Sequence, residues 1–186
     1  MTVEEIFSEL SAHMIQGLMV HDQMAAYYSF LTLKGYCRCH AYHYLKESDN
    51  YMKLNHYYHK HHDKLIKEKA ITDPKIIPKS WYAYTRTDVD ATTKRNAVKT
   101  GLEKWIEWEK STLDLYTKMY RELFAINEIA DAEYVALLIK ETSDELAHAS
   151  NLYIKKKTCD FDINSIMGDQ KEQSLKYSEK INEIWR

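Results

Sequence analysis

Turn-forming residues are scarce in this chain of 186 residues, which contains only four glycines and two prolines. Tight turns depend on these residue types, because glycine adopts positive φ readily and proline presets a bend. The many turns of an all-β or α/β fold therefore lack the residues that would form them. A hydrophobic fraction of 45% and a nearly balanced charge argue against disorder. The composition predicts an all-α fold of long helices with few breaks.

Two amphipathic segments fill the first third of the chain. The first begins at Thr2, which forms a capping box with Glu5. We predict its end at Gly35, because glycine readily adopts the left-handed conformation of a helix C-terminus. The second segment extends from about residue 37 to about residue 69. Its apolar spacing predicts an inward face that includes His59 and His62.

Both prolines, Pro74 and Pro78, lie in the one long segment without helical periodicity, about residues 70–92. A structureless loop of this length is unusual in a compact domain. A connection that runs the length of a helical bundle would account for it. The sequence therefore predicts one long crossover between the second and third helices.

Two further helical segments follow, separated by a short turn near Asn127, and a shorter one occupies about residues 163–185. Helices joined by so short a turn are antiparallel neighbours. Two helical hairpins joined by one long connection give an up-down four-helix bundle with a short fifth helix at the C-terminus. We expect residues 1–186 to form a single domain.

Charged residues on the predicted inward faces are candidates for a metal site. Glu109 lies between Trp105 and Leu113 on the inward stripe of the third helix, where an unpaired carboxylate is costly. Glu145 and His148 are three residues apart, so both side chains can reach one cation. The simpler interpretations are a Glu109 held by a tyrosine hydroxyl and a surface ion pair for Glu145 and His148.

Counting from the turn supports the pairing of the two acids. Glu109 precedes Asn127 by as many positions as Glu145 follows it. In an antiparallel hairpin these two positions face each other at the same height. The same counting is less definite for the first hairpin. A turn near residues 35–36 places His59 level with His13, and only a loop centred near residue 40 would place Asp22 level with His59.

The second helix carries the histidine-rich segment "HYYHKHHDKLI" from His56 to Ile66. His59 and His62 have the same three-residue spacing as Glu145 and His148. Imidazoles are common ligands for iron, zinc and copper. The alternative is a mixture of surface and core-edge histidines without a ligand role.

Charge, hydropathy and cysteine number bear on partners and location. The net charge of −2 gives no general attraction to nucleic acid, so nucleic acid is not expected as a partner. No apolar run approaches the roughly 20 residues of a membrane span. Three cysteines, an odd number, indicate reduced thiols and a cytoplasmic location.

The chain resembles the ferritin-like di-iron carboxylate proteins along most of its length. That family uses a Glu on the first and third helices and Glu-x-x-His on the second and fourth. "GLEKWIEWEKS" is similar to the family's third helix, with Glu109 at the bridging position, and "DELAH" matches the fourth-helix motif with Glu145 and His148. "LMVHDQMAAYYSFL" is similar to the first helix, with Asp22 in the acid's place.

The chain also departs from the family pattern in its first two helices. "HKHHDKLI" is similar to the end of the second-helix motif, with His62 or His61 as its histidine. His59 or Tyr58 stands where the second-helix glutamate belongs. On the first helix, His21 or His13 can replace Asp22 as the ligand.

The resemblance implies iron or manganese as the cofactor, with up to two ions per bundle bound by Glu109, Glu145, His148, His59, His62 and Asp22. It also implies a ferroxidase or another oxygen-dependent oxidoreductase, and assembly into a homo-oligomer. Two alternatives remain: a metal-free ferritin-like scaffold that acts by self-association or partner binding, and a DNA-protecting mini-ferritin. The mini-ferritin is less favoured, because the chain has no basic N-terminal tail.

Overall fold

The computed structural model describes residues 1–85, 87 and 89–184. Residues 86 and 88 of the predicted crossover and residue 185 of the predicted last helix lie outside the described residues. The described part of the chain forms helices and no strand: α1 (Val3–Phe30), α2 (Lys34–His62), the short 3₁₀ helix η1 (Lys79–Ala83), α3 (Ala91–Ala125), α4 (Ile129–Thr158) and α5 (Ile163–Ile184). None of these helices is long and apolar enough to cross a membrane.

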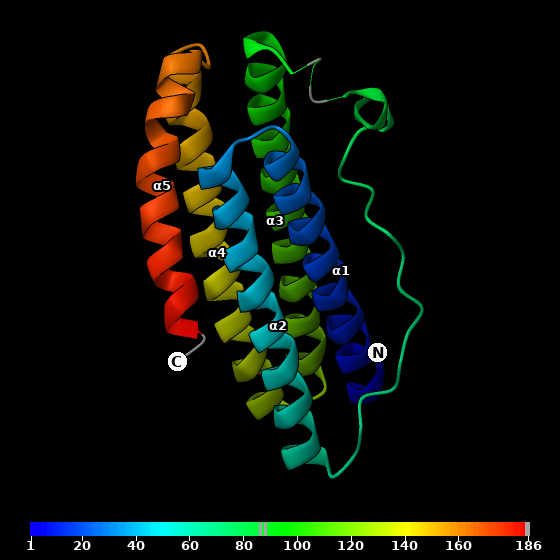
Figure 1. Cartoon of the computed structure of the whole chain (residues 1–186). Helices are drawn as coiled ribbons and strands as arrows, with labels where there is room; N and C mark the ends of the chain where they lie inside the picture. Colours follow the sequence, from blue (N-terminus) through cyan, green and yellow to red (C-terminus); the bar gives the residue numbers. More distant parts are fainter. Residues whose placement is uncertain (86, 88, 185–186) are drawn as a thin grey trace.

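The helices form a four-helix bundle with one long crossover (Figure 1). The pairs α1–α2 and α3–α4 are antiparallel hairpins that pack against each other. Residues 63–85, with η1 among them, leave the end of α2 and run alongside α1 toward the end of the bundle where α3 begins. The fifth helix, α5, folds back beside α4 and packs mainly on α2. The predicted all-α topology is confirmed.

The helix ends follow local backbone chemistry. Glu5 N donates to the Thr2 hydroxyl at 3.2 Å and Thr2 N donates to the Glu5 carboxylate at 2.8 Å, so the capping box is confirmed. The turn between α3 and α4 contains Asn127 with a φ of 64°, as the sequence indicated. The predicted extension of the second helix to about residue 69 is wrong, because Asp63 adopts a left-handed conformation that ends α2.

The predicted helix end at Gly35 is also wrong, since α1 ends at Phe30 and the positive φ of the turn falls on Thr32. Gly35 instead lies in the first turn of α2, where its N–H donates to Gln170 Oε1 of α5 at 2.6 Å. A Cβ at this position would lie 2.6 Å from the Gln170 carbonyl oxygen. The glycine is therefore required by the close approach of α5.

We expect Gly35→Ala to lower the free energy of unfolding by about 1–3 kcal/mol, because the added methyl overpacks a backbone contact. Gly168→Ala is the matched control, since a Cβ there meets no atom within 4 Å and alanine favours the helix. Urea denaturation followed by circular dichroism measures both changes. Equal stability of the two variants would contradict the close-contact explanation.

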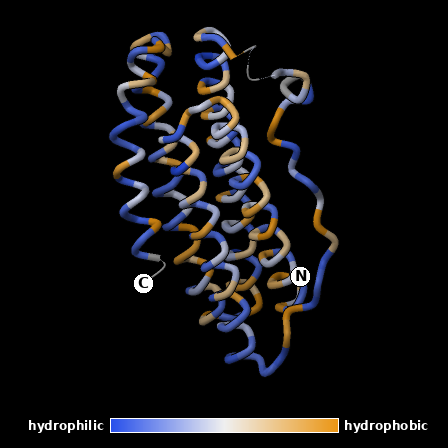
Figure 2. The backbone as a smooth tube through the Cα atoms, viewed as in Figure 1, coloured by the Kyte–Doolittle hydropathy of each residue, from blue (hydrophilic) through white to orange (hydrophobic). Residues whose placement is uncertain are grey.

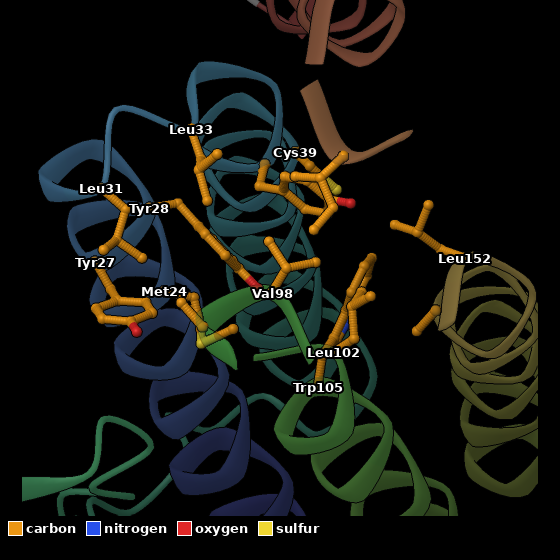
Figure 3. Close-up of a cluster of buried hydrophobic side chains, with 14 of the residues drawn as sticks. Met24, Tyr27, Tyr28, Leu31, Leu33, Cys39, Val98, Leu102, Trp105 and Leu152 are labelled. Carbon is orange, nitrogen blue, oxygen red and sulfur yellow. The ribbon is translucent and has the colours of Figure 1, made fainter. Parts of the chain in front are cut away.

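The hydrophobic core forms two clusters, one toward each end of the bundle. Figure 3 shows the first, in which Tyr28 and Leu33 of the first hairpin meet Leu102 and Trp105 of α3. The second cluster surrounds Phe7 of α1 and lies toward the other end. Along each helix hydrophobic and hydrophilic residues alternate (Figure 2), as amphipathic helices require. Between the two clusters, the helices contribute polar side chains to the interior.

Candidate metal centre

A belt of polar side chains separates the two apolar clusters at mid-height of the bundle. We call it the polar belt; it contains His21 of α1, His43 and Glu47 of α2, Glu109 of α3 and Glu145 of α4. All are buried except Glu47, which is half-buried. Each of the four helices α1–α4 therefore brings at least one potential ligand to mid-height of the bundle.

Three of these side chains converge on one point. One donor atom each from His21, His43 and Glu145 lies within 4.8 Å of the others, and His43 Nδ1 is 3.4 Å from Glu145 Oε2. Donor atoms around one ion at bond lengths of about 2.0–2.2 Å lie about 3–3.5 Å apart. Small side-chain rotations would therefore bring all three donors to one cation.

His21 and His43 carry nitrogen atoms that are not held in well-aligned hydrogen bonds. His21 Nδ1 shares a hydrogen bond with His40 Nδ1 at 3.0 Å, which leaves His21 Nε2 directed toward Glu109 Oε1 at 3.9 Å. Among the described residues, neither His21 Nε2 nor either nitrogen of His43 has a well-aligned hydrogen-bond partner. Buried polar atoms without partners call for an explanation, and a bound cation is one. The donor set thus fits a metal ion.

Glu109 is 2% exposed, as its position on the inward stripe predicted. Its Oε1 accepts a hydrogen bond from Trp105 Nε1 at 2.8 Å, so an indole rather than a tyrosine holds it. Burial, followed by the negative charges of Glu145 and Glu47, raises the pKa of Glu109 well above its usual range. In the absence of a cation the folded protein therefore favours the protonated form of this acid.

Glu145 is 8% exposed and carries its charge in the folded protein. Lys46 Nζ lies 2.5 Å from its Oε1 and His43 faces its Oε2. Burial by itself would raise the pKa of Glu145, but His43 and Lys46 hold it far below its usual value. Burial likewise lowers the pKa of His43, but Glu145 outweighs it and raises this pKa to about 10. A lysine thus already occupies one oxygen of the predicted ligand.

The sequence analysis did not identify Glu47, because the family resemblance aligns the second-helix glutamate with His59 or Tyr58. Burial and the charge of Glu145 raise the pKa of Glu47 to about 8. Its carboxyl group packs against Gly17 of α1, where a Cβ would lie 3.4 Å from the Glu47 Cδ. The signal that could have found it is the spacing of His40, His43 and Glu47, which repeats on one helical face at three and four residues.

The structure does not bring His59 and His62 to the polar belt. His59 is exposed, and His62 pairs with Asp131 at the start of α4 at 3.1 Å, among residues of the second cluster. The predicted inward face of α2 is therefore wrong. Asp22 is exposed, and of the alternatives for the first helix His21 lies in the belt. His13 is half-buried and shares a hydrogen bond with Thr112 at 2.8 Å.

His148 lies one turn after Glu145 but faces α5. Its Nε2 shares a hydrogen bond with the Tyr177 hydroxyl at 2.7 Å. Burial and the positive charge of Lys176 lower the pKa of His148 to about 4. A pocket of about 200 Å³ opens beside it and is lined by His43, Lys46 and Glu145 as well as by residues of α5. His148 therefore lies at the edge of the belt rather than among its three convergent donors.

No protein-family model matches the chain, and no curated protein matches it by sequence. Solved structures of archaeal ferritins are similar to it. An engineered closed form of the Archaeoglobus fulgidus ferritin has a TM-score of 0.77 at 17% identity and covers 94% of this chain and 97% of its own. The open-pore ferritin of the same hyperthermophilic archaeon has a TM-score of 0.76 at 17% identity, with coverages of 92% and 95%. A humanized archaeal ferritin has a TM-score of 0.77 at 17% identity, with coverages of 92% and 94%.

These likenesses and the helix order define the class: the chain has the ferritin-like fold. Its interior carries a buried cluster of histidine and glutamate side chains at mid-height.

Proposed function

We propose that this chain is a ferritin-like metal-binding protein that takes up iron, or manganese, in the polar belt. The observation that carries the proposal is the convergence of three buried donor atoms from His21, His43 and Glu145 within 4.8 Å of one another. Imidazole and carboxylate donors together bind first-row transition ions. The likeness to archaeal ferritins supports iron as the first ion to test.

The belt residues have distinct tasks in this proposal. His21, His43 and Glu145 bind the ion, while Trp105 orients Glu109 beside it. Because the pKa values of Glu109 and His43 are raised, uptake of a cation releases the protons that these two side chains hold, and binding becomes tighter as the pH rises. As a ferroxidase substrate, ferrous iron would be oxidised to ferric iron while dioxygen is reduced.

The proposal extends to assembly and location. We treat residues 1–186 as one domain, because the same four helices contribute to both apolar clusters. The ferritin-like fold supports self-assembly of identical subunits. Three free cysteines, Cys37, Cys39 and Cys159, are compatible with a cytoplasmic protein.

Metal binding tests the proposal directly. Protein freed of metal with a chelator is equilibrated anaerobically with ferrous iron, and bound metal is counted after dialysis. We expect His43→Ala to weaken binding by at least about a hundredfold, since loss of a ligand costs no less than loss of its supporting contacts. His59→Ala is the matched control on the same helix, because His59 is exposed, and it should bind like the parent. A His43→Ala protein with the parent's affinity would refute the proposed site.

Oxidation is measured next on the same samples. Dioxygen is added to the iron-loaded protein, and ferric iron is followed by its absorbance. We expect the parent to oxidise ferrous iron faster than it is oxidised free in solution. A Glu109→Ala, Glu145→Ala double variant should oxidise it only at the rate measured without protein. Equal iron-oxidation rates for the parent and the double variant would exclude ferroxidase activity in the polar belt. Metal binding would then still be decided by the dialysis experiment.

One observation favours a metal-free scaffold as the second candidate function. Lys46 and protonated His43 already balance the charge of Glu145 without a metal. The melting temperature separates the two candidates, because a ligand at about 100 times its Kd stabilises the folded state by about 2.7 kcal/mol. A melting temperature that stays constant on addition of iron, manganese and zinc would favour the scaffold.

A further inference from the structure

We propose that the polar belt holds one divalent transition-metal ion rather than two, and that the Lys46 ammonium takes the place of a second cation. This inference rests on the proposed function and specifies its stoichiometry. It departs from the two-ion expectation of the sequence resemblance. Three features of the belt carry it: the donor set, the position of Lys46 and the number of carboxylates.

The donor set is that of a single ion. Among the described residues, one group of three potential ligands converges, and it consists of two imidazoles and one carboxylate. Two histidines and one carboxylate hold single iron or zinc ions in many proteins and leave further positions for water or substrate. The remaining acids of the belt, Glu47 and Glu109, belong to no second group of three converging donors among the described residues.

The Lys46 ammonium lies between two carboxylates, as a second cation in the belt would have to. Its Nζ is 2.5 Å from Glu145 Oε1 and 3.8 Å from Glu141 Oε2, so it lies between two carboxylates of α4. The other oxygen of Glu145 faces His43 at 3.4 Å. The two oxygens of Glu145 thus serve two different positive charges: the ammonium on one side and the bound ion on the other.

The charges of the belt balance with one divalent ion. Three carboxylates, Glu47, Glu109 and Glu145, carry three negative charges once deprotonated. One divalent ion and the Lys46 ammonium supply three positive charges. A second divalent ion beside the Lys46 ammonium would leave two excess positive charges in a largely buried site, where an unbalanced charge is costly. Glu141 changes this little, because its side chain is 46% exposed and therefore screened by solvent.

The first helix adds no acid to the belt. Asp22 is exposed, and α1 contributes His21 and the bare backbone of Gly17 in its place. The Glu47 carboxyl group fills the space beside Gly17, with 3.4 Å between Cδ and a Cβ placed on the glycine. The carboxylates of the belt therefore come from α2, α3 and α4.

Binding stoichiometry tests the inference. Chelator-treated protein is titrated anaerobically with ferrous iron and separately with cobalt(II), and bound ions per chain are counted. We expect one ion for the parent and two for Lys46→Met, in which the carboxylates lose their ammonium partner but keep a side chain of similar length. Lys53→Met is the matched control, because Lys53 lies on the same helix but is exposed and pairs with Asp49. This variant should bind one ion.

A parent that binds two ions, or a folded Lys46→Met that still binds one, would overturn the inference. Lys46→Arg covers the case in which Lys46→Met fails to fold. Because arginine keeps the positive charge, this variant must bind one ion per chain. Two bound ions would again overturn the inference. If the parent binds none and Lys46→Met binds one, Lys46 fills the only site and the one-ion assignment is wrong. If no variant binds an ion, the proposed function itself fails and this inference falls with it.

Discussion

Glu145→Gln lowers the free energy of unfolding of the metal-free protein by about 3 kcal/mol in our expectation. Loss of one partner from a buried ion pair typically costs about 3–5 kcal/mol, because the other charge stays behind without compensation. Glu145 balances both Lys46 and His43. The lower end of the range applies, since the Lys46 side chain is 26% exposed and keeps some water. Urea denaturation followed by circular dichroism gives the value.

Glu141→Gln is the control for this prediction, because Glu141 touches the same lysine at 3.8 Å from a more exposed position. An exposed ion pair contributes about 0–1 kcal/mol, so this variant should change stability little. The double variant Lys46→Met, Glu145→Gln should recover part of the loss, since it removes both partners. Equal effects of Glu141→Gln and Glu145→Gln would show that burial does not strengthen the Glu145 contacts.

A rise from pH 7 to pH 9 should destabilise the metal-free protein by an amount on the order of 3 kcal/mol. The pKa of Glu47 rises from 4.5 to about 8 on folding and that of His43 from 6.5 to about 10. Both groups therefore bind protons more tightly in the folded state. Their contribution to stability is complete below the unfolded pKa values and is lost as the pH rises through the folded ones. Each pKa unit corresponds to about 1.4 kcal/mol.

The other titratable groups of the belt leave this direction unchanged. Glu109 also has a raised pKa and adds to the loss, while Glu145 stays ionised throughout the interval. Burial and the charge of His43 lower the pKa of His21 to about 3, so this imidazole is neutral when folded and largely neutral when unfolded. Lys46, whose pKa is raised, stays charged.

Urea denaturation at pH 7 and pH 9 checks the prediction, with Glu47→Gln as the comparison. That variant removes one of the groups, so its stability should fall less over the same interval. A metal-free protein that becomes more stable between pH 7 and pH 9 would contradict the assignment of protons to the belt. Metal affinity should change in the opposite direction and rise with pH, because the ion displaces these protons.

The α3–α4 half of the site was predictable from the sequence. Asn127 marks a turn whose position is unambiguous, and Glu109 and Glu145 lie at equal distances from it on strongly amphipathic helices. Both are buried, and the charge of Glu145 acts on Glu109. The long crossover was predictable for a related reason, since both prolines fall in the single segment without helical periodicity.

The α1–α2 half of the site was not predictable, because the glycine signal indicates a turn at Gly35 whereas the turn lies at Thr32. With the turn at Thr32, His21 precedes it by as many positions as His43 follows it. With the turn at Gly35, the residue facing His21 moves six positions along α2, which is about 9 Å at about 1.5 Å per residue. Residues at equal distances from a hairpin turn face each other. Applied to α1 and α2 with the turn at Gly35, this rule therefore selects histidines that lie outside the belt.

The composition of α2 also obscured its inward face. Histidine and tyrosine occur both inside and outside proteins, so a helix rich in them has no clear apolar stripe. His43 is buried while His59 is exposed, although each directly follows a tyrosine. Packing of α5 on α2 contributes to the burial of His43, because the ring of Tyr177 in α5 lies 6.2 Å from the His43 ring.

The sequence by itself determined the helix number, the two hairpins, the crossover and the burial of Glu109 and Glu145, because helical periodicity and turn residues are local properties. Only the tertiary structure decided that His21, His43 and Glu47 complete the belt and that Lys46 lies on Glu145. Those relations depend on the rotation and height of one helix against another, which are set by side-chain packing across the whole interior.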